Sequence, residues 1–205
     1  KNSYFNISTN RILIMKNILI IFYSKNGSTK KMAEKICMGV KMVNNVEPVL
    51  RTLPNIEDTN NKNISDDNNI LFATNEDLIN CDGLIIGSPT HFGNMAAPVK
   101  HFLDGTTNEW FNNSLSGKPA GVFTSTSSMH GGQETTLITM MIPLLHHGML
   151  ISGLPYSEKE LHDTKTGGSP YGPTHLSSKS NNLSEDEIKL CIAFGKRIAD
   201  QASKL

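Results

Sequence analysis

Short apolar runs alternate along the chain with segments whose apolar residues recur every three or four positions. The runs, rich in β-branched residues, predict strands covered on both faces, over 18–23, 46–53, 83–88, 119–124 and 149–151. The periodic segments predict helices over 32–40, 97–104, 133–147 and 184–202. This alternation predicts an α/β fold, a doubly wound five-stranded parallel sheet with helices on both faces.

Three segments and one proline stand apart from the alternation. Residues 1–15 are expected to be an appendage, because Met15 reads as a natural start, so that 16–205 form a single domain. Segment 55–69 is dominated by Asn, Asp and Lys and predicts a solvated loop. Segment 155–182 is rich in Gly, Pro, Ser and Thr and predicts an extended loop, a candidate lid or interface element. Pro143 is expected to bend its helix or restart it.

Charge and composition exclude several classes of function. Lys and Arg number 19, as do Asp and Glu, so the formal net charge is zero and no basic footprint for nucleic acid or anionic membrane is expected. No run approaches the roughly 18 apolar residues of a membrane span. Cys37, Cys81 and Cys191 form no Cys-x-x-Cys pair and are expected to be buried apolar residues of a reducing, cytoplasmic protein.

The remaining chemistry concentrates in loops that follow predicted strands, where ligands of such sheets bind. The loop 24–29 carries three hydroxyls, one Gly and a helix start, which suit a phosphate monoester, although a simple capped helix explains the loop equally well. The loop 88–97 combines an aromatic residue with amides, and the loop 125–133 carries small residues that let backbone N–H groups approach a ligand. Together the loops predict a mononucleotide with a planar ring, such as FMN.

Five ordered segments carry a resemblance to a known family: 21–24, 87–95, 131–134, 146–149 and 167–172. Across roughly 16–204 the chain resembles the flavodoxin-like NAD(P)H:quinone oxidoreductases of the WrbA type. The resemblance implies a flavodoxin-like sheet in the order 2-1-3-4-5, FMN as cofactor, and NADH or NADPH as electron donor. It further implies two-electron, ping-pong reduction of quinones and a homotetramer with active sites at subunit contacts.

Residue roles follow from the loops and the resemblance together. Cofactor contacts are expected from Ser24, Lys25, Asn26, Gly27, Ser28, Thr29, Pro89, Thr90, His91, Phe92, Gly93, Asn94, Ser125, Thr126, Ser127, Ser128, His130, Gly131 and His146. The resemblance makes His146 the catalytic residue. The alternative is that His146 is a histidine at a helix end without a role in the reaction. The resemblance makes Trp110 a residue that binds the substrate in the active site of a neighbouring subunit, and it makes Asn26 a second substrate-binding residue. The alternative for Trp110 is an aromatic residue with a structural role only. His147 is expected to be structural.

Some residues depart from the family pattern. His91 stands where the family has Arg, Asn26 where it often has an aromatic residue, and Ser28 where it often has His. The segment 127–130 is bulkier than its family counterpart. No metal site is predicted, because ligand-like spacing is absent around His101, His162 and His175.

Two alternative functions use the same residues differently. A flavodoxin-type electron carrier would bind the same FMN, but such carriers tend to be strongly acidic, unlike this chain. A nonenzymatic accessory or DNA-regulatory protein would need a basic face or tail, and the sequence offers none.

Overall fold

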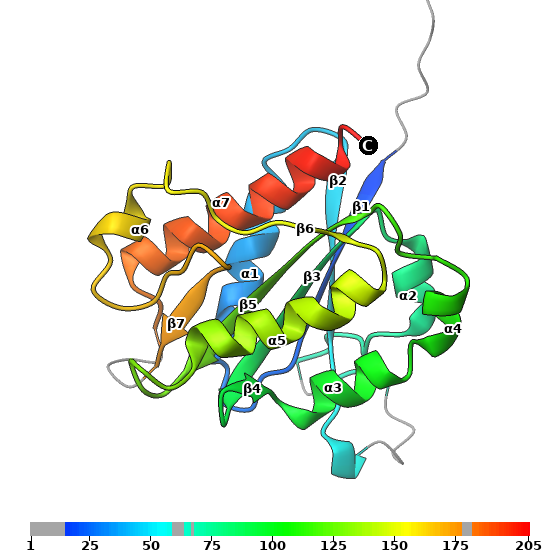
Figure 1. The fold of residues 1–205 in the computed structure, drawn as a ribbon, viewed down its shortest axis with the longest axis horizontal. Helices are drawn as coiled ribbons and strands as arrows, with labels where there is room; N and C mark the ends of the chain where they lie inside the picture. The colour runs from blue at the N-terminus through cyan, green and yellow to red at the C-terminus, as the bar shows by residue number, and fades with distance from the viewer. Residues whose placement is uncertain (1–14, 59–63, 67, 178–181) are drawn as a thin grey trace, which may run out of the picture.

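The computed structural model describes residues 15–58, 64–66, 68–177 and 182–205. Its parallel sheet runs in the order β2-β1-β3-β5-β6, with β7 added in parallel to β5 and β4 antiparallel to β3 (Figure 1). The path confirms the predicted order 2-1-3-4-5, with β5 and β6 as its fourth and fifth strands. The strands are β1 (Lys16–Phe22), β2 (Val46–Thr52), β3 (Gly83–His91), β4 (Asn94–Met95), β5 (Pro119–Thr126), β6 (Leu150–Ile151) and β7 (Thr174–Leu176).

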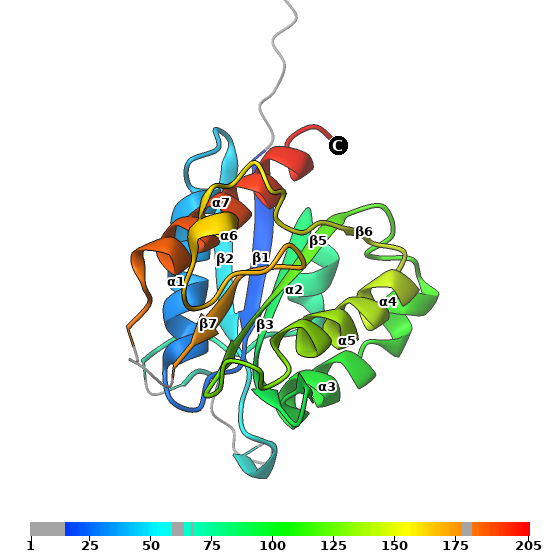
Figure 2. The same cartoon turned by 60° about the vertical axis from the view of Figure 1, so that its left-hand side comes forward.

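Helices cover both faces of the sheet, as Figure 2 shows with α1 and α7 on one side and α2, α3 and α5 on the other. The helices are α1 (Ser28–Val40), α2 (Asn75–Asn80), α3 (Ala97–Asp104), α4 (Thr107–Phe111), α5 (Gln133–His146), α6 (Glu160–Asp163) and α7 (Glu185–Ala202), with a 3-10 turn η1 (Ile56–Asp58). Alternate residues of β1 point to opposite cores: Ile18 and Ile20 pack under α1 and α7, while Leu19 and Ile21 pack under the other layer. The uninterrupted apolar run of β1 reflects this double coverage.

Helices α1 and α7 approach each other through two glycines. A Cβ on Gly39 of α1 would overlap the carbonyl oxygen of Ile192, and a Cβ on Gly195 of α7 would overlap that of Ile36. The contact is therefore reciprocal and excludes any larger side chain at either position. It brings the first and last helices of the described chain into direct backbone contact over one face of the sheet.

Several elements differ from the sequence prediction. Helices α2 and α4 were not predicted, and the segment expected as one extended loop contains α6 and β7. Helix α5 continues through Pro143 to His146 without restarting. Of the expected appendage, residues 1–14 lie outside the described residues. So do 59–63 and 67 of the expected solvated loop, whose described part includes η1.

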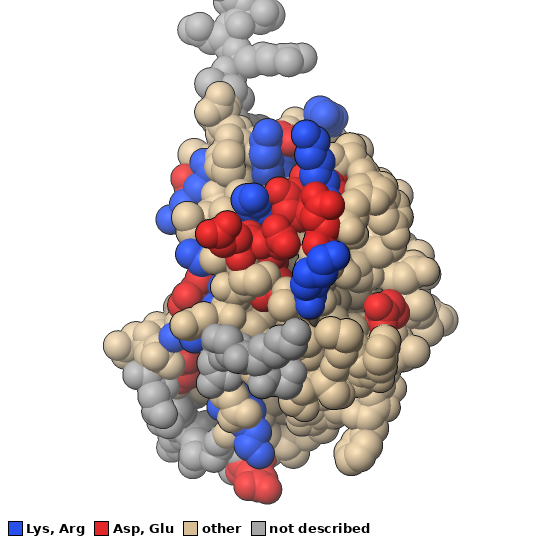
Figure 3. All heavy atoms as spheres, turned by 90° about the vertical axis from the view of Figure 1, so that its left-hand side faces the viewer, with Lys and Arg blue, Asp and Glu red and all other residues tan. Residues whose placement is uncertain are grey.

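Charged side chains of both signs are interspersed on the side of the molecule that carries α6 (Figure 3). One ion pair there joins α7 to α6, with 3.4 Å between Lys189 Nζ and Glu160 Oε1. Among the described helices, none combines the length and the apolarity that crossing a bilayer requires.

Candidate active site

The loop between β1 and α1 leaves backbone donors free at the start of the helix. Gly27 is the N-cap residue, with a φ of 85°, and it provides no side-chain acceptor for the N–H groups of the first turn. Ser28 and Thr29, which follow it, are both buried. The loop is closed by a bond of 3.3 Å from the Lys30 backbone N–H to Ser24 Oγ. Free N–H groups and hydroxyls at a helix N-terminus form an anion-binding arrangement.

The three predicted loops converge on one cavity of about 170 Å³ at the carboxyl ends of β1, β3 and β5. Its lining residues are Ser24, Lys25, Asn26, Ser28, Thr29, Pro89, Thr90, His91, Ser125, Thr126, Ser127 and Ser177. A buried contact of 2.9 Å joins the hydroxyls of Thr29 and Ser125, which links the first loop to the third. Thr90 Oγ1 lies 3.1 Å from Thr124 Oγ1 and joins the second loop to β5. We call this cavity the cradle.

The chemistry of the cradle suits an anion. Hydroxyl groups dominate its lining, Lys25 adds a cation, and none of the described lining residues is a carboxylate. Such a set of donors fits a phosphate monoester, the group by which FMN is expected to attach. Eleven of the expected cofactor-binding residues are thereby brought together.

Other expected cofactor residues lie on the rim of the cradle rather than in its lining. Phe92 and Gly93 form the two-residue turn between β3 and β4, with φ values of 53° and 75°. A turn with two positive φ values is strained for a bulky residue, and the Phe92 side chain is fully exposed at its tip. This tip meets the start of α5, because a Cβ on Gly132 would lie 2.7 Å from the Gly93 Cα. Gly27, Asn94, Ser128, His130 and Gly131 are the remaining expected residues outside the lining.

His146 lies elsewhere, in a second cavity of about 300 Å³ that it shares with Trp110. We call this cavity the α4–α5 pocket; its lining is completed by Leu103, Asp104, Thr106, Thr107, Ile142, Pro143 and His147. Helix α5 starts at Gln133, at the end of the loop whose residues Ser125, Thr126 and Ser127 line the cradle, whereas His146 is its last residue. At about 1.5 Å per residue the helix separates them by roughly 20 Å. Within one chain, His146 and Trp110 therefore lie together but apart from the cradle.

His147 is held in the structure as a buried side chain. Its Nε2 lies 2.9 Å from Thr106 Oγ1, which itself donates to the Leu103 carbonyl oxygen at 2.7 Å. Burial lowers the pKa of His147. The Thr106 hydroxyl, having used its proton, accepts from Nε2–H, so the neutral ring is protonated on Nε2. These contacts fix the position of the His147 ring in the interior.

The cysteines have the properties expected of structural residues. All of them are free, Cys81 and Cys191 are buried and Cys37 is partly buried. Burial raises the pKa of the Cys37 and Cys81 thiols to about 11, and it raises that of Cys191 as well, which keeps the thiolate fraction low. In the part of the chain that the structure describes, no group of three His, Cys, Asp or Glu side chains is placed to hold a metal ion.

The sequence prediction missed the contribution of β7 to this site. Ser177, which directly follows β7, lines the cradle, and its hydroxyl donates to the Thr126 carbonyl oxygen at 3.0 Å. His175 of β7 is buried against Glu187 of α7, with 2.9 Å between Nδ1 and Oε2. The only signal in the sequence was that segment 155–182 is longer than a connector requires.

Solved structures with this fold include flavodoxins. A crystal structure of a WrbA-like flavodoxin from Agrobacterium tumefaciens superposes with a TM-score of 0.68 at 22% identity, covering 92% of this chain and 98% of that chain. A flavodoxin from the domain Archaea superposes with a TM-score of 0.61 at 18% identity, covering 91% and 98%. These likenesses establish the flavodoxin-like fold.

The family is established by sequence. Residues 16–157 match the family described as NADPH-dependent FMN reductase. A protein of Solidesulfovibrio magneticus named NAD(P)H dehydrogenase (quinone) is 39% identical over 201 residues, which is 92% of this chain and 98% of the relative. A protein of the same name from Geobacter sulfurreducens is 40% identical over 203 residues, with the same coverage. The chain therefore belongs to the NADPH-dependent FMN reductase family and, within it, to the NAD(P)H dehydrogenase (quinone) group, the WrbA-type proteins that its motifs resemble.

Proposed function

We propose that this protein is an FMN-dependent NAD(P)H:quinone oxidoreductase that reduces quinones to hydroquinones by two-electron, ping-pong turnover. The observation that carries the proposal is the cradle, where three loops place hydroxyls, backbone donors and a lysine around one cavity at the carboxyl ends of the strands. The names of its relatives at about 40% identity support the quinone as substrate.

The chain's own residues bind and orient the reactants. FMN supplies the redox chemistry when bound, since it can take a hydride from NADH or NADPH and pass two electrons to a quinone. Ser24, Ser28 and Thr29, with the free N–H groups of α1, would hold its phosphate. Backbone N–H groups of 125–131 would face the ring and favour negative charge on it. Thr90 and Asn94, from the second loop, are the residues proposed to bond the edge of the ring.

Catalysis and substrate cover come from a neighbouring subunit in this proposal. His146 and Trp110 share the α4–α5 pocket, roughly 20 Å along α5 from their own cradle, so they reach a flavin only across a subunit contact. Trp110 is about half exposed, at 47%, which leaves its ring available to a second chain. We therefore propose a homotetramer in which Trp110 covers the substrate, His146 orients it or supplies a proton, and Asn26 contacts it from the cradle side.

The cellular setting is proposed from the same features. Free cysteines with raised thiol pKa values suit a reducing compartment, and we propose the cytoplasm. NADH or NADPH and a quinone are the proposed small-molecule partners.

The decisive experiment is a steady-state assay of the FMN-loaded protein with benzoquinone and either NADH or NADPH. Parallel lines in double-reciprocal plots, with hydroquinone formed in equal amount to the nicotinamide consumed, are expected. Sedimentation of the same sample at micromolar concentration should give a tetramer. Reduction of one-electron acceptors alone, with no hydroquinone formed, would instead support the electron-carrier function.

A further inference from the structure

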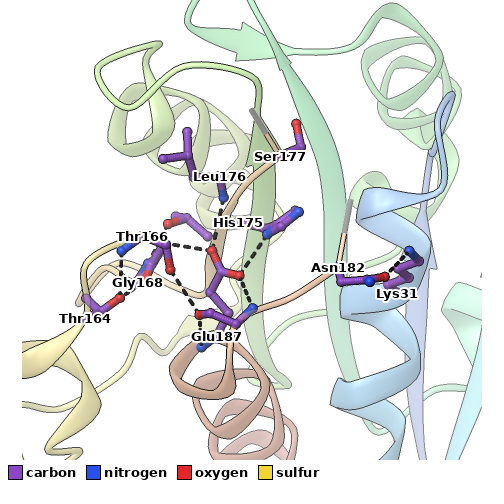
Figure 4. Close-up of polar contacts among 12 residues, drawn as sticks. Lys31, Thr164, Thr166, Gly168, His175, Leu176, Ser177, Asn182 and Glu187 are labelled. Atoms are coloured by element: carbon purple, nitrogen blue, oxygen red, sulfur yellow. Dashed lines mark hydrogen bonds and ion pairs between the residues drawn. The ribbon is translucent and has the colours of Figure 1, made fainter. Parts of the chain in front are cut away.

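Glu187 is a buried carboxylate that accepts four hydrogen bonds. Its Oε1 accepts from the backbone N–H groups of Gly167 and Leu176, at 2.9 and 3.1 Å. Its Oε2 accepts from the Ser184 backbone N–H at 2.8 Å and lies 2.9 Å from His175 Nδ1 (Figure 4). Burial acts to raise the pKa of Glu187, but the hydrogen bonds from His175, Ser184 and Leu176 outweigh it and hold the pKa at about 2. The carboxylate is therefore ionised, and His175 Nδ1 carries the proton it accepts.

The other ring nitrogen of His175 is buried without a partner. Only 1% of the residue is exposed, and Nε2 has no hydrogen-bond partner among the described residues. In its imidazolium form the ring carries a second N–H, on Nε2. A buried ion pair is stabilising only when its remaining donors are also satisfied. The structure thus contains a buried ring nitrogen that lacks a partner among the described residues, and as a donor it would need an acceptor.

This donor lies beside the cradle. His175 of β7 is in register with Ser125 of β5, so both side chains point to the same face of the sheet, and Ser125 Oγ contacts Thr29 Oγ1 at the first turn of α1. Ser177, two residues further along the same face, lines the cradle itself. Figure 4 shows the His175 ring extending from β7 toward α1, with its Glu187-bonded nitrogen on the side of α7.

The charges around His175 favour an anion as the missing acceptor. The charged group in contact with His175 is Glu187 on α7, which is already bonded to Nδ1. On the neighbouring α1, Lys31 Nζ donates to Asn182 Oδ1 at 3.0 Å. The facing side chain from β5 is the neutral Ser125. A dianionic group in the cradle would satisfy the free N–H, whereas a neutral ligand would gain much less from it.

We propose that His175 is a further residue of the FMN phosphate site, whose Nε2–H, oriented by Glu187, donates to the phosphate from the interior side of the cradle. This inference rests on the proposed FMN function. It differs from the predicted loop contacts because the donor comes from β7, which lies beyond residues 16–157, the range matched by the family model. Glu187 is then a positioning residue that fixes the ring and its protonation.

The test compares FMN with riboflavin, which lacks the phosphate, in fluorescence titrations of His175→Phe and the wild type. Loss of one charge-assisted hydrogen bond predicts about 10- to 100-fold weaker FMN binding. Riboflavin binding should change less than about 2-fold, because the ring contacts are untouched. His162→Gln, which removes an exposed histidine of α6, is the control and should leave both affinities unchanged.

The outcomes separate this inference from the proposed function. If the wild type binds neither flavin, the FMN function itself is wrong. If His175→Phe weakens FMN and riboflavin equally, or neither, a buried water or packing explains the free nitrogen and the inference is wrong. If the variant does not fold, NMR of wild-type protein labelled with ¹⁵N-histidine decides: a His175 Nε2–H signal should move on adding FMN but stay in place with riboflavin. An unmoved signal with FMN would overturn the inference.

Discussion

The hydroxyl groups of Thr29 and Ser125 lie 2.9 Å apart in the protein interior, although 96 positions separate the two residues in the chain. The contact ties the first turn of α1 to the end of β5. Both residues are buried, so the floor of the cradle is fixed by the packing of the fold before any ligand arrives. Preorganised donors of this kind bind an anion without the free-energy cost of rearranging the protein.

The turn at Gly27 is expected to be essential for FMN binding. Its φ of 85° is unfavourable for any β-branched residue, although no atom lies within 4 Å of the position of a Cβ. Gly27→Val should cost about 1–2 kcal/mol of unfolding free energy and move the N–H groups that face the phosphate. We expect FMN affinity to fall at least about tenfold in a fluorescence titration.

Gly117 provides the matched control for this substitution. Its φ is 75°, it also has open space around a Cβ, and it lies just before β5, at the end of the sheet away from the cradle. Gly117→Val should lose similar stability in urea unfolding but keep the wild-type FMN affinity. Equal FMN affinity in folded Gly27→Val would mean that the phosphate binds elsewhere.

Trp110 is expected to contribute to quinone binding but not to FMN binding. A substrate stacked on the flavin needs its second face closed against water, and an aromatic cover is worth about 1–2 kcal/mol. Trp110→Ala should therefore raise the quinone KM about 5- to 30-fold in steady-state assays, with FMN affinity nearly unchanged. Phe111→Ala is the control, because Phe111 is the adjacent exposed ring but does not line the α4–α5 pocket. If the quinone kinetics of a tetrameric Trp110→Ala protein are unaltered, Trp110 has a structural role only.

Mixed tetramers should show whether one subunit completes the site of another. At an FMN concentration too low to load Gly27→Val subunits, these subunits keep Trp110 but hold little FMN, whereas Trp110→Ala subunits bind FMN but lack its cover. Co-expression with two different tags and tandem purification yields tetramers that contain both kinds of subunit. Quinone reductase activity of the mixture should exceed that of either parent, because some FMN sites face an intact Trp110. If Trp110 served its own subunit, the mixture would never exceed the better parent.

Stability is expected to fall in acid because of Glu187. The folded pKa of about 2 lies below the ordinary value of 4.5, so the ionised form stabilises the fold above pH 4.5 and this contribution disappears as pH falls from about 4.5 toward 2. At about 1.4 kcal/mol for each pKa unit, the full contribution is about 3 kcal/mol. Urea unfolding of Glu187→Gln at several pH values should give a lower stability at neutral pH and a flatter acid dependence than the wild type.

A neighbouring carboxylate serves as the control for this effect. Glu185 lies in the same first turn of α7 but is exposed. Glu185→Gln should retain the acid dependence of the wild type. A Glu187→Gln protein with the same slope as Glu185→Gln would assign the acid sensitivity to other carboxylates.

Features encoded by local patterns were predicted correctly from the sequence. The start of the helix predicted over 184–202 is an example, because a capping box fixes it: Ser184 Oγ accepts from the Glu187 backbone N–H at 3.2 Å, and the Glu187 carboxylate accepts from that of Ser184 at 2.8 Å. The buried strand β1 and the convergence of the loops that follow β1, β3 and β5 were also predicted correctly. In a parallel sheet of this topology, the order of the strands determines which loops lie side by side.

Features that depend on distant contacts were not predicted. The same Glu187 also accepts from His175, and nothing in the local spacing indicates that a capping residue pairs with a strand of three residues. Helix α2 is six residues long and has little apolar periodicity. The placement of His146 away from its own cradle required the length and direction of α5, which the motif alone does not give.

The glycine-mediated crossing of α1 and α7 also bears on how the protein is made. A ribosome releases α1 early and α7 near the end of the described chain, and until then Ile20, Phe22 and Phe123 of the sheet lack part of their cover. Because such contacts join sequence-distant segments, folding of this layer waits until α7 has been synthesised. A nascent chain paused before α7 would therefore expose an apolar face prone to aggregation, which is the kind of surface that chaperones bind.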